Sequence, residues 1–272
     1  MKKLGLLTLH YGYNEGAILQ SLCLAGNLKK RLAGWDVDII DQRYPGKLRA
    51  VYNDNGEREL GLQSFIDKEL PLSENRFIED SHKHAFEYIN KEYGAVIVGS
   101  DEVWKVDYNN YLFGLFFSQK NPWCPPFPNV YWPGVEVKVP KIAFAASIGS
   151  INCGKIPKSE LARMKEKLLT FRLLGVRDQR TRDFLGHLDP KLGEKAELVP
   201  DPTFFLESIN LTDANGLKSK LISAGVDFSR PRALVISPEF KYSRLIADSF
   251  KRKDFQVISL TFKNRSADVD LS

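Results

Sequence analysis

The chain has 272 residues, of which 43% are hydrophobic and 27% are charged, a composition typical of an ordinary soluble globular protein with one or two domains. No apolar run approaches the ~20 residues of a membrane span. The cysteines at Cys23, Cys124 and Cys153 form neither a disulfide framework nor a metal-ligand motif, and this spacing favours a reducing cytoplasm and no metal. The net charge of +5 is spread along the chain, which is weak evidence for nucleic-acid binding and is compatible with an anionic small substrate.

Residues 3–9 form a short apolar run that predicts a strand, and residues 17–32 carry apolar side chains at helical spacing. Asn14 precedes this helix and is a residue type preferred at an N-cap. Residues 35–40 predict a second strand, so the three segments form a β-α-β unit. Such a unit implies a parallel sheet with a right-handed crossover.

The part of the chain after the second strand is less regular. Residues 44–72 are polar, with a short helix predicted near 62–69, and residues 74–93 are predicted to be mostly helical. Residues 95–98 predict a short buried strand. Residues 108–140 combine aromatic side chains with prolines, which indicates an aromatic loop or lid; the alternatives are packing over a sheet edge and a subunit contact.

The rest of the chain alternates predicted strands with predicted helices. The strands are residues 141–146, 173–176, 196–199, 232–237 and 255–261. The helices are residues 158–171, 181–188 and 242–253. Residues 207–215 have the composition of a linker, so we expect a first domain over residues 1–206 and, over residues 207–272, the linker with part of a second domain.

Polar residues follow five of the predicted strands. They are residues 10–16, Asp41, residues 99–104, residues 147–149, and Arg177 with Asp178. Ligands of parallel α/β sheets bind outside the carboxyl ends of the strands, which share one edge. We therefore expect these clusters to converge on one crevice, with Ser100, Asp101 and Trp104 at its rim. The alternative is that Asp101 caps the next helix and Trp104 packs under a loop.

Three residues near these strand ends suggest specific chemistry. Arg177 could hold a phosphate or carboxylate with its planar guanidinium, or form a salt bridge to Asp178 or Asp201. His10 is a candidate general acid or base, or a loop histidine with satisfied hydrogen bonds. Gly16, at a helix start, could admit an anion near the backbone amides, or serve only a tight turn.

Several well-known functional motifs are absent. The chain has neither G-x-G-x-x-G nor G-x-x-x-x-G-K-[ST], and Gly149-Ser150 lacks the neighbours of a G-x-S-x-G elbow. The sequence therefore does not predict a dehydrogenase, a P-loop ATPase or an α/β-hydrolase.

Short motifs at these strand ends occur in a distinctive order. They are Leu7-Thr8-Leu9-His10 with Asn14-Glu15-Gly16-Ala17 and Leu19-Gln20; Ile39-Ile40-Asp41; Val98-Gly99-Ser100-Asp101-Glu102-Val103-Trp104; Ala143-Phe144-Ala145-Ala146-Ser147-Ile148-Gly149; Gly175-Val176-Arg177-Asp178; and Val199-Pro200-Asp201-Pro202-Thr203. Each motif is short, but as an ordered set they resemble the polysaccharide pyruvyl transferase family.

The resemblance implies two Rossmann-like halves, as in GT-B glycosyltransferases, with the active site in the cleft between them. It also implies transfer of the enolpyruvyl unit of phosphoenolpyruvate to two hydroxyls of a surface-polysaccharide or exopolysaccharide sugar, giving a cyclic ketal and phosphate. Phosphoenolpyruvate would be the donor substrate, with no separate cofactor. The acceptor would be a saccharide or lipid-linked saccharide, in the cytoplasm or at the inner membrane face, and an oligomeric enzyme is compatible with the sequence.

The resemblance also suggests roles for single residues. The catalytic candidates are His10, Asp101 and Arg177, with Arg177 as an anion clamp and Asp101 as the group that orients or deprotonates a sugar hydroxyl. Trp104 is expected to stack on a sugar face. The substrate-binding candidates are Asn14, Gly16, Gln20, Gly99, Ser100, Trp104, Ser147 and Gly149.

Members of this family continue into a later region that carries a histidine motif and supplies much of the phosphoenolpyruvate site. This chain has no histidine after His187 and stops soon after the second domain begins. We therefore expect a fragment, a shortened gene product, or a half completed by another polypeptide, with the C-terminal half incomplete. Two other functions stay open: a GT-B-like glycosyltransferase, and a non-catalytic relative that binds a saccharide or a partner chain.

Overall fold

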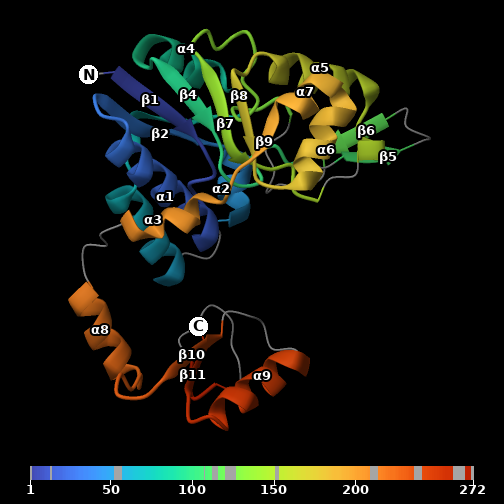
Figure 1. The fold of residues 1–272 in the computed structure, drawn as a ribbon. Coiled ribbons are helices and arrows are strands. Elements are labelled where there is room, and N and C mark those ends of the chain that lie inside the picture. The colour runs from blue at the N-terminus through green and yellow to red at the C-terminus, as the bar shows by residue number, and fades with distance from the viewer. Residues whose placement is uncertain are drawn as a thin grey trace. The chain divides into compact units, whose positions relative to one another are not determined.

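The structure is a computed structural model of the chain (Figure 1). It describes residues 2–12, 14–51, 57–106, 108–111, 116–119, 127–150, 153–208, 214–235, 241–259 and 267–270. Contacts between residues divide the chain into two units, Met1–Ile209 and Asn210–Ser272. We describe each unit by itself.

The first unit is built on a seven-stranded parallel sheet with the strand order β3-β2-β1-β4-β7-β8-β9. The strands are β1 Lys2–Leu7, β2 Trp35–Arg43, β3 Leu72–Ile78, β4 Ala95–Val98, β7 Lys141–Ala146, β8 Leu173–Val176 and β9 Ala196–Leu198. The order runs outward in both directions from the pair β1 and β4, which is the doubly wound arrangement. Ligand crevices form at this switch point, so β1 and β4 mark the place to look for a site.

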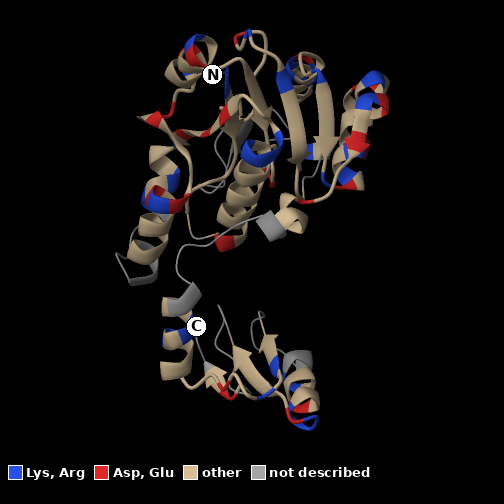
Figure 2. Ribbon diagram, turned by 60° about the vertical axis from the view of Figure 1, so that its left-hand side comes forward, with Lys and Arg blue, Asp and Glu red and all other residues tan. Residues whose placement is uncertain are grey.

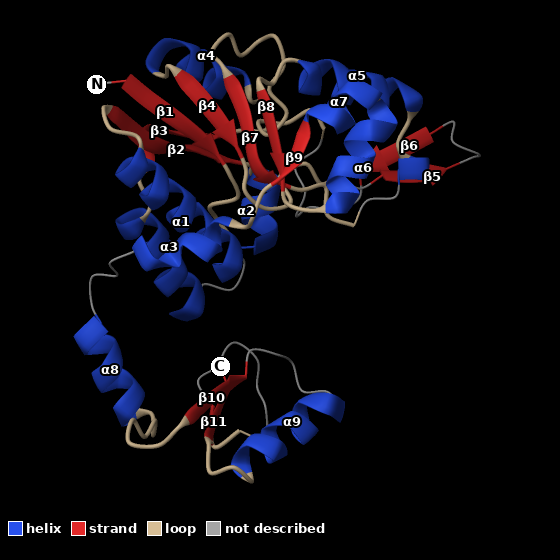
Figure 3. Ribbon diagram, in the orientation of Figure 1, coloured by secondary structure: helices blue, strands red, loops and turns tan. Residues whose placement is uncertain are grey.

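Helices cover both faces of this sheet and bury two hydrophobic cores (Figures 1 and 3). One face carries α1 Glu15–Arg31 and α3 Glu57–Glu69, and the other carries α4 Lys83–Glu92, α5 Lys158–Leu169, α6 Gln179–Leu188 and α7 Pro190–Lys195. The remaining short elements are α2 Pro45–Val51 and the 3-10 helices η2 Cys153–Lys155 and η3 Pro202–Ser208.

Helix α1 and strand β4 illustrate how the local sequence produces these elements. The Asn14 side chain accepts a hydrogen bond from the Ala17 backbone N–H, which confirms the predicted N-cap. Basic residues in the last turn of α1 complement the negative end of its dipole. Strand β4 is a continuous apolar run because both of its faces are covered.

Two sequence predictions need correction. Residues 74–93 are not mostly helical, because strand β3 takes the first part and α4 begins only at Lys83. Within residues 108–140, strands β5 Tyr108–Tyr111 and β6 Phe116–Gln119 form an antiparallel hairpin instead of a loop. Tyr131 and Trp132 are buried in the core, so this part of the aromatic segment packs within the unit. Residues 112–115 and 120–126, which include Phe113 and Trp123, lie outside the described residues.

The second unit contains a small parallel sheet in the order β10-β11-β12. Its elements are α8 Ala214–Ser223, β10 Arg232–Val235, α9 Lys241–Lys251, β11 Gln256–Ser259 and β12 Val269–Asp270. Helix α8 was not predicted from the sequence. The two parallel sheets with their helices confirm the predicted α/β class. Among the described residues, no helix is long and apolar enough to span a membrane.

Candidate functional site

The loops that follow β4 and β7 are joined at the carboxyl edge of the large sheet. The Ser147 backbone N–H donates to the Asp101 carbonyl oxygen at 2.9 Å, and the Trp104 N–H donates to the Ser147 carbonyl oxygen at 3.1 Å. These bonds fix the two loops against each other. The predicted convergence of strand-end residues at this edge is therefore present for these two loops.

Arg177, directly after β8, is the centre of the polar groups at this edge. Its Nη1 lies 3.3 Å from Asp101 Oδ1, 3.3 Å from Asp201 Oδ2 and 3.5 Å from Gln20 Oε1. Gln20 Oε1 also accepts a hydrogen bond from Ser100 Oγ at 3.0 Å. We call these five residues, Gln20, Ser100, Asp101, Arg177 and Asp201, the Arg177 cluster.

Asp201 was considered only as a salt-bridge partner of Arg177, and the structure shows that salt bridge. The chain after β9 forms η3, which packs on α1, where Asn27 Nδ2 donates to the Phe205 carbonyl oxygen at 3.1 Å. The packing of η3 on α1 places Asp201 next to Arg177. The signal in the sequence was the motif at residues 199–203, directly after the last strand of the sheet.

The charges of the Arg177 cluster do not favour a simple anion clamp. Two carboxylates and one guanidinium give the cluster a formal charge of −1. The side chains of Asp101, Asp201 and Arg177 are only 13%, 18% and 24% exposed, so their charges are weakly screened. Along the ribbon, in contrast, Lys and Arg are interspersed with Asp and Glu (Figure 2).

The backbone around the cluster requires unusual conformations. Gly99 has a φ of 118°, and a Cβ at this position would lie 2.1 Å from the Phe144 carbonyl oxygen. Asp101 has a φ of 76°, which is rare for a residue other than glycine and concentrates at functional sites. Gly149 has a φ of 61°, and a Cβ there would lie 2.6 Å from the carboxylate carbon of Glu102. Gly99 and Gly149 thus permit the turns that present the polar residues.

Ser147, directly after β7, contacts the N-cap residue of helix α6. Its Oγ donates to Asp178 Oδ2 at 2.6 Å and accepts from the Gly149 N–H at 2.9 Å. Asp178 Oδ1 caps the helix by accepting from the Thr181 N–H at 2.8 Å. Burial would raise the pKa of Asp178, but the hydrogen bonds from Ser147 and Thr181 outweigh it and lower the pKa. The Ser147 hydroxyl therefore holds a loop and a cap in place.

His10 is buried, with 1% of its surface exposed. Its Nδ1 lies 3.0 Å from the Thr8 carbonyl oxygen, and its Nε2 lies 3.0 Å from Asp41 Oδ1. Burial alone would raise the pKa of Asp41, but hydrogen bonds from His10 and Arg43 outweigh burial and hold the pKa well below its usual value. Both ring nitrogens of His10 therefore have hydrogen-bonding partners within the chain. The structure therefore favours the alternative of a satisfied loop histidine over a general acid or base.

Trp104 is fully buried, which corrects its expected role at the crevice rim. Its Nε1 donates to the Tyr131 carbonyl oxygen at 3.0 Å, and its ring packs against Trp132 and Phe171 with centroids 5.6 and 5.9 Å away. A side chain without exposed surface offers no face to a sugar, so Trp104 is a core residue. Asn14 is a helix cap, and Gly16 lies in the first turn of α1 beside the Asn14 carboxamide.

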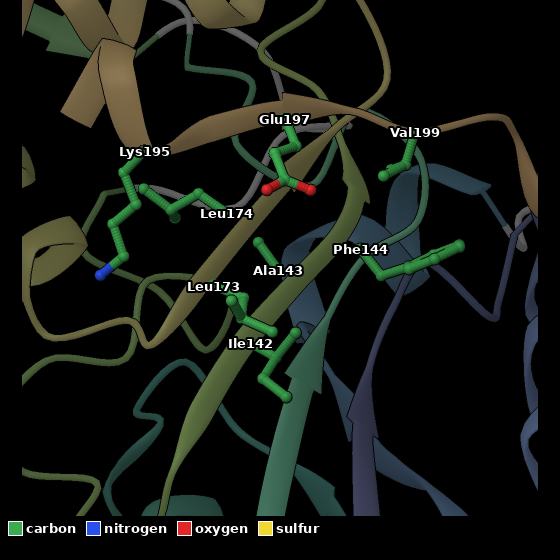
Figure 4. Close-up of a pocket in the computed structure, with 9 residues that line it drawn as sticks. Ile142, Ala143, Phe144, Leu173, Leu174, Lys195, Glu197 and Val199 are labelled. Atoms are coloured by element: carbon green, nitrogen blue, oxygen red, sulfur yellow. The ribbon is translucent and has the colours of Figure 1, made fainter.

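A separate pocket of about 130 Å³ lies on the face of strands β7, β8 and β9 (Figure 4). Its lining is Ile142, Ala143, Phe144, Leu173, Leu174, Gly175, Lys195, Glu197 and Val199. The lining is mostly apolar and contains no member of the Arg177 cluster. Among the described residues, no three His, Cys, Asp or Glu side chains are grouped so that they could hold a metal ion.

The chain resembles solved structures in fold. A UDP-GlcNAc 2-epimerase from Methanocaldococcus jannaschii is 12% identical with a TM-score of 0.51, over 98% of this chain and 66% of that one. A UDP-GlcNAc 2-epimerase from Neisseria meningitidis bound to UDP-GlcNAc is 12% identical with a TM-score of 0.50, over 97% of this chain and 66% of that one. The chain thus spans slightly less than two thirds of either structure, and at this identity the likeness concerns the GT-B-like fold alone.

Sequence comparison assigns the family. No curated protein matches the chain significantly in sequence. The family profile described as polysaccharide pyruvyl transferase matches residues 14–270, which is nearly the whole chain and includes every member of the Arg177 cluster. The chain belongs to the polysaccharide pyruvyl transferase family.

Proposed function

We propose that this protein takes part in transferring the pyruvyl unit of phosphoenolpyruvate to a saccharide, with formation of a ketal and release of phosphate. The support is the Arg177 cluster at the carboxyl edge of the sheet, in a chain that belongs to this family. The cluster combines carboxylates, a guanidinium and a carboxamide, which are groups that bind and orient sugar hydroxyls, while the buried Ser100 hydroxyl donates to Gln20 Oε1.

The proposed reaction balances without an oxidant or reductant. A proton adds to the methylene carbon of phosphoenolpyruvate, and C2 becomes cationic. One sugar hydroxyl bonds to C2 and loses its proton. Phosphate then leaves with the electron pair of its C–O bond, and a second hydroxyl bonds to C2 and loses its proton. Of the two protons released, one replaces the proton consumed at the methylene carbon and the other is taken up by phosphate.

Asp101 is the residue we assign to the hydroxyl that attacks C2. Its Oδ1 lies against Arg177, and its Oδ2 has no hydrogen-bond partner among the residues that the structure describes. An ionised carboxylate with a free oxygen can orient a hydroxyl and accept its proton. Arg177 holds Asp101 in place from one side, so that Oδ2 is left to the substrate.

The test is an assay for both products. The purified chain is incubated with phosphoenolpyruvate and a set of saccharide acceptors, while ³¹P NMR follows inorganic phosphate and ¹H NMR follows the ketal methyl group. We expect both products with the unaltered chain and with the control Asp183→Asn, which changes an exposed residue of α6. Asp101→Asn should lower the rate by about 100-fold or more. Transfer of a sugar from a nucleotide sugar, without phosphate from phosphoenolpyruvate, would favour a glycosyltransferase instead.

A further inference from the structure

We propose that the Arg177 cluster binds hydroxyl groups of a neutral saccharide, and not the phosphate or carboxylate of phosphoenolpyruvate. The inference deepens the proposed function, on which it rests for naming the saccharide as the acceptor. It departs from the expectation that Arg177 is an anion clamp.

The first argument is the charge around Arg177. Asp101 and Asp201 both lie 3.3 Å from the same nitrogen, Nη1. Asp178 is close enough that the positive charge of Arg177 contributes, after burial and hydrogen bonds, to lowering the pKa of Asp178. An anion that reached the guanidinium would meet these carboxylates in a partly buried site, where repulsion is weakly screened. A neutral hydroxyl meets no such repulsion.

The second argument is the set of hydrogen-bonding atoms left open. Within the described part of the chain, Arg177 makes its side-chain contacts through Nη1, and its Nε and Nη2 have no partner. The same holds for the amide nitrogen of Gln20 and for Asp101 Oδ2. The open atoms of the cluster thus include both donors and an acceptor. A hydroxyl uses both, whereas phosphate and carboxylate groups require donors.

The third argument is that the contacts within the cluster are loose. The three Nη1 contacts are 3.3 to 3.5 Å long, whereas charge-assisted N–H···O bonds are usually about 2.7–2.9 Å. Nη1 carries two protons for three acceptors, so the three contacts cannot all be well aligned at once. A hydroxyl can insert into such a cluster by replacing a weak contact with a stronger one.

Asp201→Asn separates a hydroxyl site from an anion site, because the two predict opposite responses. The change raises the cluster's formal charge from −1 to zero. It should leave the fold intact, because an amide oxygen can still accept from the Thr203 N–H and Oγ, which now lie 3.0 and 2.7 Å from Asp201 Oδ1. Asp183→Asn is the matched control, since Asp183 lies on the exposed side of α6 and contacts Gln179.

The probes are methyl glycosides of galactose, glucose and mannose, and inorganic phosphate. Saturation-transfer NMR measures glycoside binding, and calorimetry measures phosphate binding. We expect at least one glycoside to bind to the unaltered chain and to Asp183→Asn, and to bind roughly tenfold more weakly to Asp201→Asn. Phosphate should not compete with the glycoside in the unaltered chain. Tryptophan fluorescence checks that each variant is folded.

Three results would overturn the inference: no glycoside binds, phosphate displaces the glycoside, or Asp201→Asn gains phosphate affinity without losing glycoside affinity. Arg177→Lys provides a second variant, because a hydroxyl site should weaken when the planar fork is lost even though the positive charge is kept. Failure of the proposed function looks different. Glycoside binding without phosphate release from phosphoenolpyruvate would refute the transferase reaction and leave the hydroxyl site standing.

Discussion

Asp41 lies near the end of β2, and replacing it by asparagine removes the negative charge that compensates three side chains, those of His10, Arg43 and Arg76. Asp41 Oδ1 accepts from His10 Nε2 at 3.0 Å and from Arg43 Nε at 2.6 Å. Its Oδ2 accepts from Arg43 Nη2 at 3.1 Å and from Arg76 Nε at 2.6 Å. An asparagine presents an N–H₂ group where one of these oxygens stood, so at least one donor faces another donor.

The size of the effect follows from burial. The side chain of Asp41 is 1% exposed and that of Arg43 is 9% exposed, so the guanidinium of Arg43 would lose its main countercharge without gaining water. Removing one partner of a buried ion pair costs about 3–5 kcal/mol of unfolding free energy. Arg76 is 43% exposed and adds little to this figure, because solvent screens its charge.

Asp67→Asn is the matched control. Asp67 contacts the same two arginines, with Oδ1 2.8 Å from Arg76 Nη2 and 3.5 Å from Arg43 Nη2, but its side chain is 53% exposed. The same chemical change in this exposed position should lower the free energy of unfolding by less than about 1 kcal/mol. Burial of the carboxylate is therefore the main difference between the two variants.

Urea unfolding followed by tryptophan fluorescence is the suitable assay. All four tryptophans of the chain lie within Met1–Ile209, so their fluorescence reports the first unit without interference from the second. The reasoning would be refuted if Asp41→Asn lowered the free energy of unfolding by less than about 1 kcal/mol, as little as Asp67→Asn does. It would mean that the buried network is relaxed or hydrated in solution.

The remaining predictions concern pH, backbone geometry and the core. The pKa of Asp41 is lower in the folded chain than in the unfolded chain. The stabilisation by Asp41 is therefore complete above about pH 4 and is lost as the pH falls towards the folded pKa. The difference in unfolding free energy between the unaltered chain and Asp41→Asn, measured with urea, should shrink below about pH 4. A difference independent of pH would show that charge is not its source. Gly99→Ala should lower the free energy of unfolding by about 4 kcal/mol or more, because the new Cβ would overlap the Phe144 carbonyl oxygen. Gly26→Ala, in an open position of α1, should instead raise it by about 0.5–1 kcal/mol. Urea unfolding measures both changes. Trp104→Phe should lower the free energy of unfolding by about 1–3 kcal/mol and change the affinity for the glycoside by less than about twofold. Loss of glycoside binding without loss of stability would instead support a sugar-stacking role for Trp104.

The local elements of the sheet were readable from the sequence wherever an apolar run was bounded by polar residues or glycine. Strands β4, β7 and β8 have the predicted bounds, because buried parallel strands are short and continuously apolar. Strand β3 was missed because it is an edge strand, and polar residues at its centre are exposed. Its pattern does not differ enough from that of an exposed helix.

The candidate site was predicted in part. The rule that ligands bind at the carboxyl edge of a parallel sheet selected Ser100, Asp101 and Arg177, and these residues are in contact through Gln20 and Arg177. The rule works because strand direction, which the β-α-β pattern reveals, decides the edge at which each loop emerges. The motif at residues 199–203 marked Asp201 in the same way, although only the fold shows that it shares Arg177 with Asp101.

Only the tertiary structure decided which of these residues join the Arg177 cluster and which serve the core. His10 and Trp104 follow strands just as Asp101 does, yet the first is enclosed by Thr8 and Asp41 and the second by aromatic rings. Burial and pairing depend on segments that are remote in sequence: Gln20 and Arg177 are 157 positions apart. A local pattern determines strands, helices and the edge where polar loops gather, but the charge balance of the cluster arises only when the sheet brings those loops together.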